Sequence, residues 1–335
     1  MREAVGSLAT GRWEELADKS LSGGRPTREE ARAVLAVDDD ELLAVLAAAF
    51  RVRRYYFGRK VKLNMLMNAK SGVCPEDCGY CSQSIVSTAP IQKHSLLSRE
   101  VIVEGAREAR RRKAGTYCIV ASGRGPSGRE LREVAAAVRQ IKEELPMKVC
   151  ACLGLLSPEQ AVELKAAGVD RYNHNLNTSS DHYGRITTTH TYEDRVRTIE
   201  AVKQAGISPC SGVIVGMRET DVQILDVAYA LRELDADSIP VNFLHAIPGT
   251  PLEGCDELDP RRCLKVLALF RFVCPAREIR VSGGREVNLR SLQPLSLYPA
   301  NAIFIGDYLT TPGQSAEADY RMISDLGFEI EECAL

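Results

Sequence analysis

The stretch CPEDCGYC, residues 74–81, brings three thiols, Cys74, Cys78 and Cys81, within eight residues. Pro75 and Gly79 stand between them, and both residue types favour turns. The segment is therefore predicted to be a loop whose sulfur atoms can gather around one centre. Thiolates select zinc, copper(I) or iron–sulfur clusters, so this loop is predicted to bind a metal.

The number of ligands separates the candidate metals. A closed structural zinc site takes four ligands, and no Cys or His follows the loop at C-x-x-C or H-x-x-x-H spacing. A [4Fe–4S] cluster that is held by three cysteines leaves one iron open to a substrate or cofactor, as a catalytic metal keeps one free position. The loop favours such a cluster, and a structural zinc site remains the alternative.

Outside this loop, short β-like runs alternate with amphipathic helical patterns, which is typical of parallel βα units. Strands are predicted at residues 62–68, 116–122, 148–154, 170–176, 209–216, 238–246, 278–283 and 301–307. Eight such strands close most simply as a (β/α)8 TIM-type barrel, which commonly takes about 250 residues, with its active site at the carboxyl ends of the strands. The cysteine loop follows the first strand and is expected at that mouth.

The remaining residues are predicted to extend this barrel. Two helices are expected between residues 27 and 57, and they would form an N-terminal helical cap. Residues 1–26 are polar and glycine-rich, and we expect them to wrap the surface without a core element. The predicted domains are an extension and cap at 1–58, the barrel at 59–327 and a C-terminal tail at 328–335.

Composition limits the partners and the location. Lys and Arg number 43 against 45 Asp and Glu, so no basic surface for nucleic acid or an anionic membrane is expected, and the substrate should be small. No apolar run approaches the length that crosses a bilayer. Eleven cysteines and an N-terminus that does not look like a secretory signal favour a reducing cytoplasm over a disulfide framework.

A second group of thiols lies inside the predicted strands. Cys118, Cys150 and Cys210 come from three different strands, and Cys152 faces the same way as Cys150 because side chains alternate along a strand. Each cysteine taken alone fits the interpretation of a small buried hydrophobic residue. Three strands that each offer a thiol to one barrel favour a second metal site.

These features resemble those of a known family. The C-x-x-x-C-x-x-C spacing, with Tyr80 before the last cysteine, resembles the signature of the radical S-adenosylmethionine (SAM) superfamily. Over nearly its whole length the chain is similar to the biotin synthase family within it. The matching stretches are CPEDCGYCSQS, KAGTYCIVASGRGP, KVCACLG, GVDRYNHNLNTS, CSGVIVGMRET, ADSIPVNFLHAIPGTPL, IRVSGGREVNLRSLQP and NAIFIGDYLTT.

The resemblance implies two clusters. A [4Fe–4S] cluster would be bound by Cys74, Cys78 and Cys81, with SAM on its open iron. A [2Fe–2S] cluster would be held in the barrel by the ligands Cys118, Cys150, Cys210 and Arg280. Physical reasoning alone makes Arg280 an interior ion pair or anion clamp, because a guanidinium has no lone pair for a metal.

The resemblance also implies contacts to SAM and to the substrate, dethiobiotin. SAM would contact Tyr80, Asn175, Arg195, Gly212, Ile214 and Gly216, and dethiobiotin would contact Asn173, Asn175 and Asn242. Amides can both donate to and accept from a cyclic urea, and glycines permit close backbone approach. The alternatives are a structural role for each Asn and a solvated helix-face charge for Arg195.

Two positions depart from the superfamily pattern. Ala121-Ser122-Gly123 stands where a Gly-Gly-Glu element often grips the SAM amino group, and that contact is left unassigned. Asn177 stands where some members of the family carry an Asp that contacts ribose.

The implied reaction converts dethiobiotin to biotin. The 5′-deoxyadenosyl radical from SAM would abstract hydrogen, and the second cluster would donate the sulfur. The implied partners are an electron-donating flavoprotein or ferredoxin and a second copy of the chain. Rival interpretations are another radical SAM barrel, such as a maturase or a methylornithine-type mutase, and a non-catalytic iron–sulfur redox sensor. The mutase or maturase would need no second cluster, and the sensor would have no use for an amide-lined barrel interior.

Overall fold

Strands and helices alternate along residues 9–332, the part of the chain that the computed structural model describes. The strands are β1 (Lys60–Lys70), β2 (Thr116–Ala121), β3 (Lys148–Cys152), β4 (Arg171–Asn173), β5 (Ser208–Cys210), β6 (Val213–Val215), β7 (Ser238–Phe243), β8 (Glu278–Val281), β9 (Ala302–Phe304) and β10 (Glu329–Ile330). The α-helices are α1 (Ala9–Leu21), α2 (Arg28–Leu35), α3 (Leu42–Phe57), α4 (Arg99–Arg111), α5 (Gly128–Glu144), α6 (Pro158–Ala166), α7 (Ser180–Tyr183), α8 (Tyr192–Gln204), α9 (Asp221–Glu233), α10 (Pro260–Val273), α11 (Arg285–Leu289) and α12 (Ala316–Asp325). Two 3-10 helices are η1 (Asp39–Glu41) and η2 (Arg290–Leu297).

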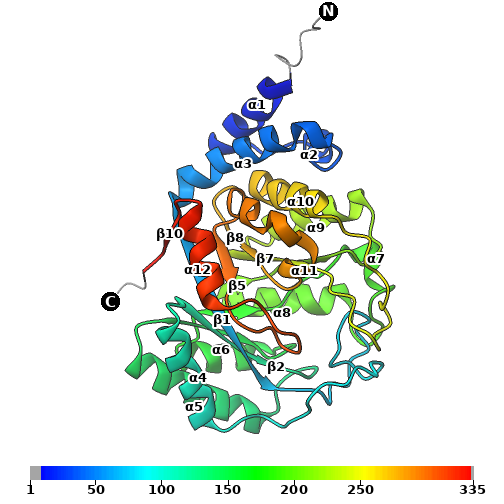
Figure 1. Ribbon diagram of the computed structural model, residues 1–335. Coiled ribbons are helices and arrows are strands. Elements are labelled where there is room, and N and C mark those ends of the chain that lie inside the picture. The colour runs from blue at the N-terminus through cyan, green and yellow to red at the C-terminus, as the bar shows by residue number, and fades with distance from the viewer. Residues whose placement is uncertain (1–8, 333–335) are drawn as a thin grey trace, which may run out of the picture.

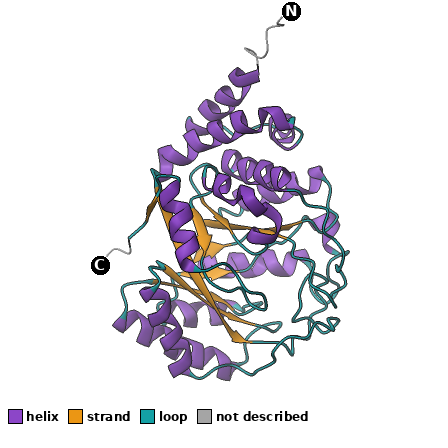
Figure 2. Cartoon of the chain, in the orientation of Figure 1, coloured by secondary structure: helices purple, strands orange, loops and turns teal. Residues whose placement is uncertain are grey.

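The strands form a closed parallel barrel that the helices surround (Figure 2). Neighbouring strands follow the order β10-β1-β2-β3-β4-β5-β7-β8-β9, β6 pairs with β7, and the pairing of β1 with β9 closes the ring. Because β5 and β6 together take one place, the barrel has eight strand positions. This arrangement confirms the predicted (β/α)8 barrel with its N-terminal helical cap.

Alternation along the strands separates the core from the barrel interior. In β2, Tyr117 and Ile119 are fully buried, and the Tyr117 hydroxyl donates to the backbone oxygen of Ile102 in α4 at 3.0 Å. The neighbouring residues Cys118 and Val120 line a cavity inside the barrel. The hydrophobic core therefore lies between strands and helices, and the interior is left for polar and sulfur-containing side chains.

One predicted strand is broken in two. Cys210 in β5 pairs with Ser238, and pairing with β7 resumes only at Val213 and Val241. Between them, a Cβ atom on Gly212 would lie 1.9 Å from the backbone oxygen of Pro240. The chain therefore runs too close to β7 at this point to keep a regular ladder.

The helical cap packs on the outside of the barrel, where α2 and α3 contact α10 (Figure 1). The expectation that residues 1–26 hold no core element is wrong for α1, which packs on α3. Trp13, Leu16 and Ala17 of α1 are buried, and the Trp13 indole donates to Glu41 Oε2 at 2.9 Å. Residues 1–8 lie outside the described part of the chain.

Two further features complete the fold. In the segment expected to be a tail, Glu329 and Ile330 pair with the beginning of β1. Among the described residues, no helix is long and apolar enough to span a bilayer.

Candidate active site

The cysteine loop follows β1 at the carboxyl end of the barrel. Cys78 is buried, and Cys74 and Cys81 are half-buried. Burial raises the pKa of Cys78, and it raises the pKa of Cys81 to about 12 although backbone hydrogen bonds from Gln83 and Ser84 oppose it. The three cysteines lie on one loop at the same end of the barrel. A metal that binds here must displace their protons.

The donor set fits an iron–sulfur cluster. No group of three His, Cys, Asp or Glu side chains among the described residues could hold a metal ion. In a cubane each cysteine binds a different iron, so the sulfurs need only surround a shared space. Three thiols on one loop meet that requirement.

A cavity of about 370 Å³ lies between this loop and the barrel interior. Six of the residues expected to contact SAM or substrate line it, namely Tyr80, Asn173, Asn175, Arg195, Ile214 and Asn242. Cys118, Cys152 and Arg280 line it as well, whereas Gly212 and Gly216 do not. The barrel thus brings most of the predicted contacts to one space.

Three barrel thiols meet beside this cavity. Cys118 and Cys150 are paired residues of β2 and β3, and the Cys150 thiol has both Cys118 and Cys210 as neighbours, while its own hydrogen bond goes to the Ala151 oxygen at 3.9 Å. All three residues are at most 3% exposed. These neighbours and burial raise the pKa of Cys150, whereas the proximity of Cys150 and the charge of Arg280 lower the pKa of Cys210. Burial raises the pKa of Cys152 to about 12.

The contacts of Arg280 bear on both of its predicted roles, an interior ion pair and a ligand of the second cluster. Its Nη2 donates to Glu278 Oε1 and to Ser238 Oγ, each at 2.8 Å, so the guanidinium forms a buried ion pair. Its Nε is buried without any hydrogen-bond partner, although buried polar atoms are normally paired. The charge of Arg280 also interacts with Cys210 and Cys118. Together with the unpaired Nε, this is consistent with a further group bound among the thiols.

The side chains of Asn173 and Asn242 already form hydrogen bonds within the protein. Asn173 Nδ2 donates to Asn175 Oδ1 at 3.0 Å and lies 3.3 Å from the Cys210 sulfur. Asn242 Nδ2 donates to the Val213 oxygen, and Asn242 Oδ1 accepts from the Gly283 amide, both at 3.0 Å. Asn242 keeps one further hydrogen and one lone pair for a ligand, because an amide can form four such bonds. Both hydrogens of Asn173 are used, because its Nδ2 also donates to the Cys210 oxygen at 3.4 Å, and Asn173 therefore offers a ligand its Oδ1.

Arg195 and Tyr80 lie on the side of the cavity near the cysteine loop. Arg195 is 8% exposed, which contradicts the alternative of a solvated helix-face charge. The Tyr80 hydroxyl lies 3.5 Å from Arg195 Nη2 and accepts from Asn177 Nδ2 at 2.6 Å. Asn177 therefore orients Tyr80.

The G-x-I-x-G-x-x-E element is explained by backbone packing. Gly212 approaches Pro240 too closely for a side chain, and Gly216 has a φ of +104° with Leu258 at 2.7 Å from its missing Cβ. Glu219 accepts from the Gly216 and Met217 amides at 2.8 and 2.7 Å and so closes the turn. The two glycines shape the strand that presents Ile214 to the cavity.

Gly212→Ala is expected to lower the free energy of unfolding by about 3 kcal/mol, because rigid backbone blocks the new methyl group. Gly184 has open space around its missing Cβ and an ordinary φ of −65°, so Gly184→Ala is the matched control. Urea unfolding of the two variants measures the difference. Equal midpoints would contradict the close approach of β6 to β7.

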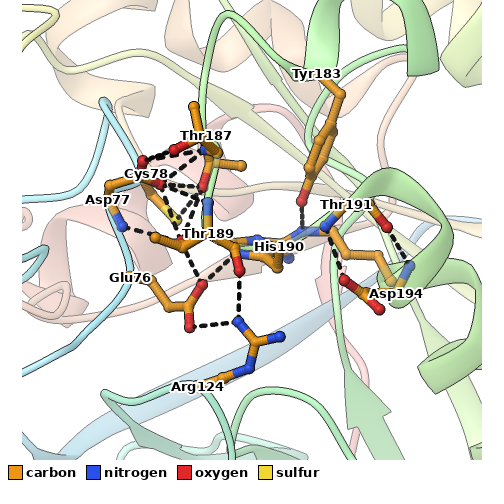
Figure 3. Close-up of polar contacts among 12 residues, drawn as sticks. Glu76, Asp77, Cys78, Arg124, Tyr183, Thr187, Thr189, His190, Thr191 and Asp194 are labelled. Atoms are coloured by element: carbon orange, nitrogen blue, oxygen red, sulfur yellow. Dashed lines mark hydrogen bonds and ion pairs between the residues drawn. The ribbon is translucent and has the colours of Figure 1, made fainter.

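Sequence reasoning missed the side chains that hold the cysteine loop in place. Glu76 and Asp77 accept hydrogen bonds from residues 187–190, which lie more than 100 positions later (Figure 3). Ser122, in the unassigned segment, donates to the Gly72 oxygen at 2.6 Å and so holds the start of the same loop. The signal available was the presence of two carboxylates between the cysteines.

Comparison with known proteins supports the same class. A model of the Radical SAM superfamily matches residues 69–230, and a model of the Biotin and Thiamin Synthesis associated domain matches residues 240–329. The biotin synthase of Geobacillus thermodenitrificans (strain NG80-2) is 65% identical over 95% of this chain and 96% of its own length. That of Bacillus subtilis (strain 168) is 61% identical over 95% of both chains.

Solved structures share the fold at low identity. Methylornithine synthase (PylB) matches with a TM-score of 0.83 and 21% identity over 95% of this chain and 97% of that one. The hydrogenase maturase HydG from Carboxydothermus hydrogenoformans matches with a TM-score of 0.80 and 17% identity over 97% of this chain and 80% of that one. A maturase and a methylornithine-type mutase are the two rival enzymes that the sequence analysis named, so the fold alone does not distinguish them from a biotin synthase.

The three-cysteine loop at the mouth of a parallel barrel defines the class of radical SAM enzymes. Within that class, the chain is more than 60% identical to curated biotin synthases over 95% of its length. The chain belongs to the biotin synthase family.

Proposed function

We propose that this chain inserts sulfur into dethiobiotin to form biotin, with Cys74, Cys78 and Cys81 as the ligands of a [4Fe–4S] cluster. The observation that carries the proposal is the position of the cavity. Arg195 and Tyr80 lie on its side near the cysteine loop, and Cys118 and Arg280 line it within the barrel. A substrate in this space would touch both a radical source and a sulfur source.

When bound, the [4Fe–4S] cluster and SAM supply an electron and a 5′-deoxyadenosyl radical. The residues of the chain bind SAM, orient it and exclude water. Arg195 offers the remaining N–H of its Nη1 to the SAM carboxylate, and Ile214 presents an apolar side chain to the same cavity. The walls of the barrel shield the reacting carbon from solvent.

The sulfur donor is a substrate of the reaction. We assign Cys118, Cys150, Cys210 and Arg280 as the ligands of a [2Fe–2S] cluster from which one sulfide is consumed. The proximity of Cys150 to Cys118 and Cys210 and the unpaired Arg280 Nε support this ligand set. The lowered pKa of Cys210 favours its thiolate, which is the form that binds iron.

Dethiobiotin would bind by its cyclic urea to the amides of Asn173, Asn175 and Asn242. The free oxygen of Asn173 can accept from a urea N–H, and the remaining hydrogen and lone pair of Asn242 can bind the urea C=O and N–H groups. Asn173 also contacts the Cys210 sulfur at 3.3 Å. A urea held there would place the substrate beside the sulfur donor.

An electron-donating flavoprotein or ferredoxin is the proposed redox partner, and a homodimer is the proposed assembly. The ten cysteines among the described residues are all free thiols, which suits a reducing cytoplasm.

The proposal is tested by anaerobic reconstitution of the full chain. Two clusters would give about six irons and six acid-labile sulfides per chain, and biotin should form from dethiobiotin with SAM and dithionite. Four irons with SAM cleavage but no biotin would instead indicate another radical SAM reaction. A cluster without any SAM cleavage would indicate a redox sensor.

Asn242→Ala is expected to weaken dethiobiotin binding by about 1–3 kcal/mol, because one urea hydrogen bond is left unmet, while both clusters stay intact. The dissociation constant of dethiobiotin in the presence of SAM measures the loss, and iron content checks the clusters. Asn288 also donates to two backbone oxygens but does not line the cavity, so Asn288→Ala is the control for structural damage. An unchanged constant in Asn242→Ala would remove this residue from the substrate site.

A further inference from the structure

Two segments that lie far apart in the sequence, residues 76–77 and 187–190, are joined by hydrogen bonds at the cysteine loop (Figure 3). Asp77 accepts from Thr187 Oγ1 at 2.5 Å and from the Thr188 amide at 2.9 Å. Glu76 Oε2 accepts from Thr189 Oγ1 at 2.6 Å and from His190 Nδ1 at 2.5 Å. The two carboxylates between Cys74 and Cys78 therefore bind residues 187–190 directly.

The contacts of His190 fix its tautomer. Its Nε2 lies 2.8 Å from Arg195 Nη2, and a guanidinium can only donate, so Nε2 carries no hydrogen. The ring hydrogen is then on Nδ1 and points to Glu76. Burial and the charge of Arg195 both lower the pKa of His190, which agrees with a neutral ring in this arrangement. Glu76 is 6% exposed, as is His190, so water does not compete for these bonds.

Arg195 is held by groups from several elements. Its Nε donates to the Tyr183 hydroxyl in α7, and its Nη1 donates to the Asn175 backbone oxygen at 2.9 Å. With the bonds of Nη2 to His190 and to the Tyr80 hydroxyl, four of its five N–H groups have partners, and one N–H of Nη1 remains for the cavity that Arg195 lines. The direction of this remaining N–H group is set by the four contacts.

We propose that His190 and Glu76 are positioning residues that fix the guanidinium of Arg195 relative to the cysteine loop. The inference rests on the proposed function, in which Arg195 binds the SAM carboxylate. Because Glu76 lies between two cluster ligands, the chain Glu76–His190–Arg195 would hold the SAM carboxylate and the open iron in one mutual geometry. A ligand that is held by several groups at once binds more tightly when those groups are already in position, because less conformational entropy is lost on binding.

The test compares two replacements of His190 in the reconstituted full chain. His190→Phe keeps the ring that packs edge-on against Tyr183 at 5.8 Å but removes both nitrogens. His190→Gln keeps one donor and one acceptor. We expect SAM to bind about tenfold more weakly to His190→Phe and within about threefold of the wild type to His190→Gln. Equilibrium dialysis of SAM measures both, and the iron content of each variant should stay unchanged.

Arg195→Gln and the double variant separate the positioning role from the proposed function. If His190 acts through Arg195, His190→Phe adds less than about twofold once Arg195 is Gln, since the two effects are not additive. Arg197→Gln, on the same helix with a side chain that is 67% exposed, is the matched control and should bind SAM normally.

Each other result has one meaning. Normal SAM binding in His190→Phe, with weak binding in Arg195→Gln, would overturn the positioning role and leave the proposed function standing. Normal binding in Arg195→Gln would overturn the proposed SAM site itself. Loss of iron from His190→Phe, or no recovery in His190→Gln, would assign His190 to folding of the loop and overturn the inference.

Discussion

Alanine in place of Cys74, Cys78 or Cys81 is expected to abolish the formation of 5′-deoxyadenosine from SAM, and with it the formation of biotin. Two thiols cannot hold a cubane that keeps one iron open, so SAM loses both its binding site and its electron source. The loop lies outside the strands, and the hydrogen bonds of Glu76 and Asp77 to residues 187–190 do not involve the substituted thiols, so the fold should survive in each variant. Chromatography after incubation with dithionite measures the product.

A cysteine that lies elsewhere provides the control. Cys263 is fully buried in α10 and belongs to the hydrophobic core, so Cys263→Ala should keep its SAM cleavage at a cost of about 1 kcal/mol in stability. Circular dichroism should show the same helix content in all four variants. Cleavage at a rate comparable to the wild type in any of the three loop variants would remove the loop from the mechanism.

The barrel was predictable because each of its elements carries a local signal. The eight predicted strands overlap the observed ones, and the alternation in β2 that puts Cys118 inside also buries Ile119 outside. The same alternation placed Cys150 and Cys152 on one face and could not choose between them, and the set of Cys118, Cys150 and Cys210 came from the resemblance to the family. The helix α1 was also predictable, since Trp13, Leu16 and Ala17 recur at helical spacing, but the polar residues around them concealed the pattern.

The remaining features depend on contacts that exist only once the barrel has closed. The break at Gly212 reflects the position of the Pro240 oxygen on the neighbouring strand. The bond between Glu76 and His190 joins residues 114 positions apart, and no local pattern at either residue indicates the other. The sequence therefore indicates which chemistry the site can hold, and the closed fold determines which residues support it.

Replacing Cys118, Cys150 or Cys210 with alanine is expected to abolish biotin formation. The variants should still cleave SAM to 5′-deoxyadenosine, although this cleavage no longer leads to biotin. If the three thiols hold a sulfide-donating [2Fe–2S] cluster, loss of one ligand removes the sulfur source, whereas the [4Fe–4S] site is built on a separate loop. Mössbauer or visible spectra of the reconstituted variants measure the two clusters, and biotin yield is read beside them. Each variant should lose about two irons and keep about four.

Cys152 is the internal control for this assignment. It shares the interior face of β3 with Cys150 and lines the cavity, whereas Cys150 has both Cys118 and Cys210 as neighbours. Cys152→Ala should therefore make biotin with a loss of about 1 kcal/mol in stability, as expected for a small buried residue. An essential Cys152 with a dispensable Cys150 would contradict the ligand set. If all four variants made biotin, the second-cluster assignment would fail, and the barrel thiols would be packing residues.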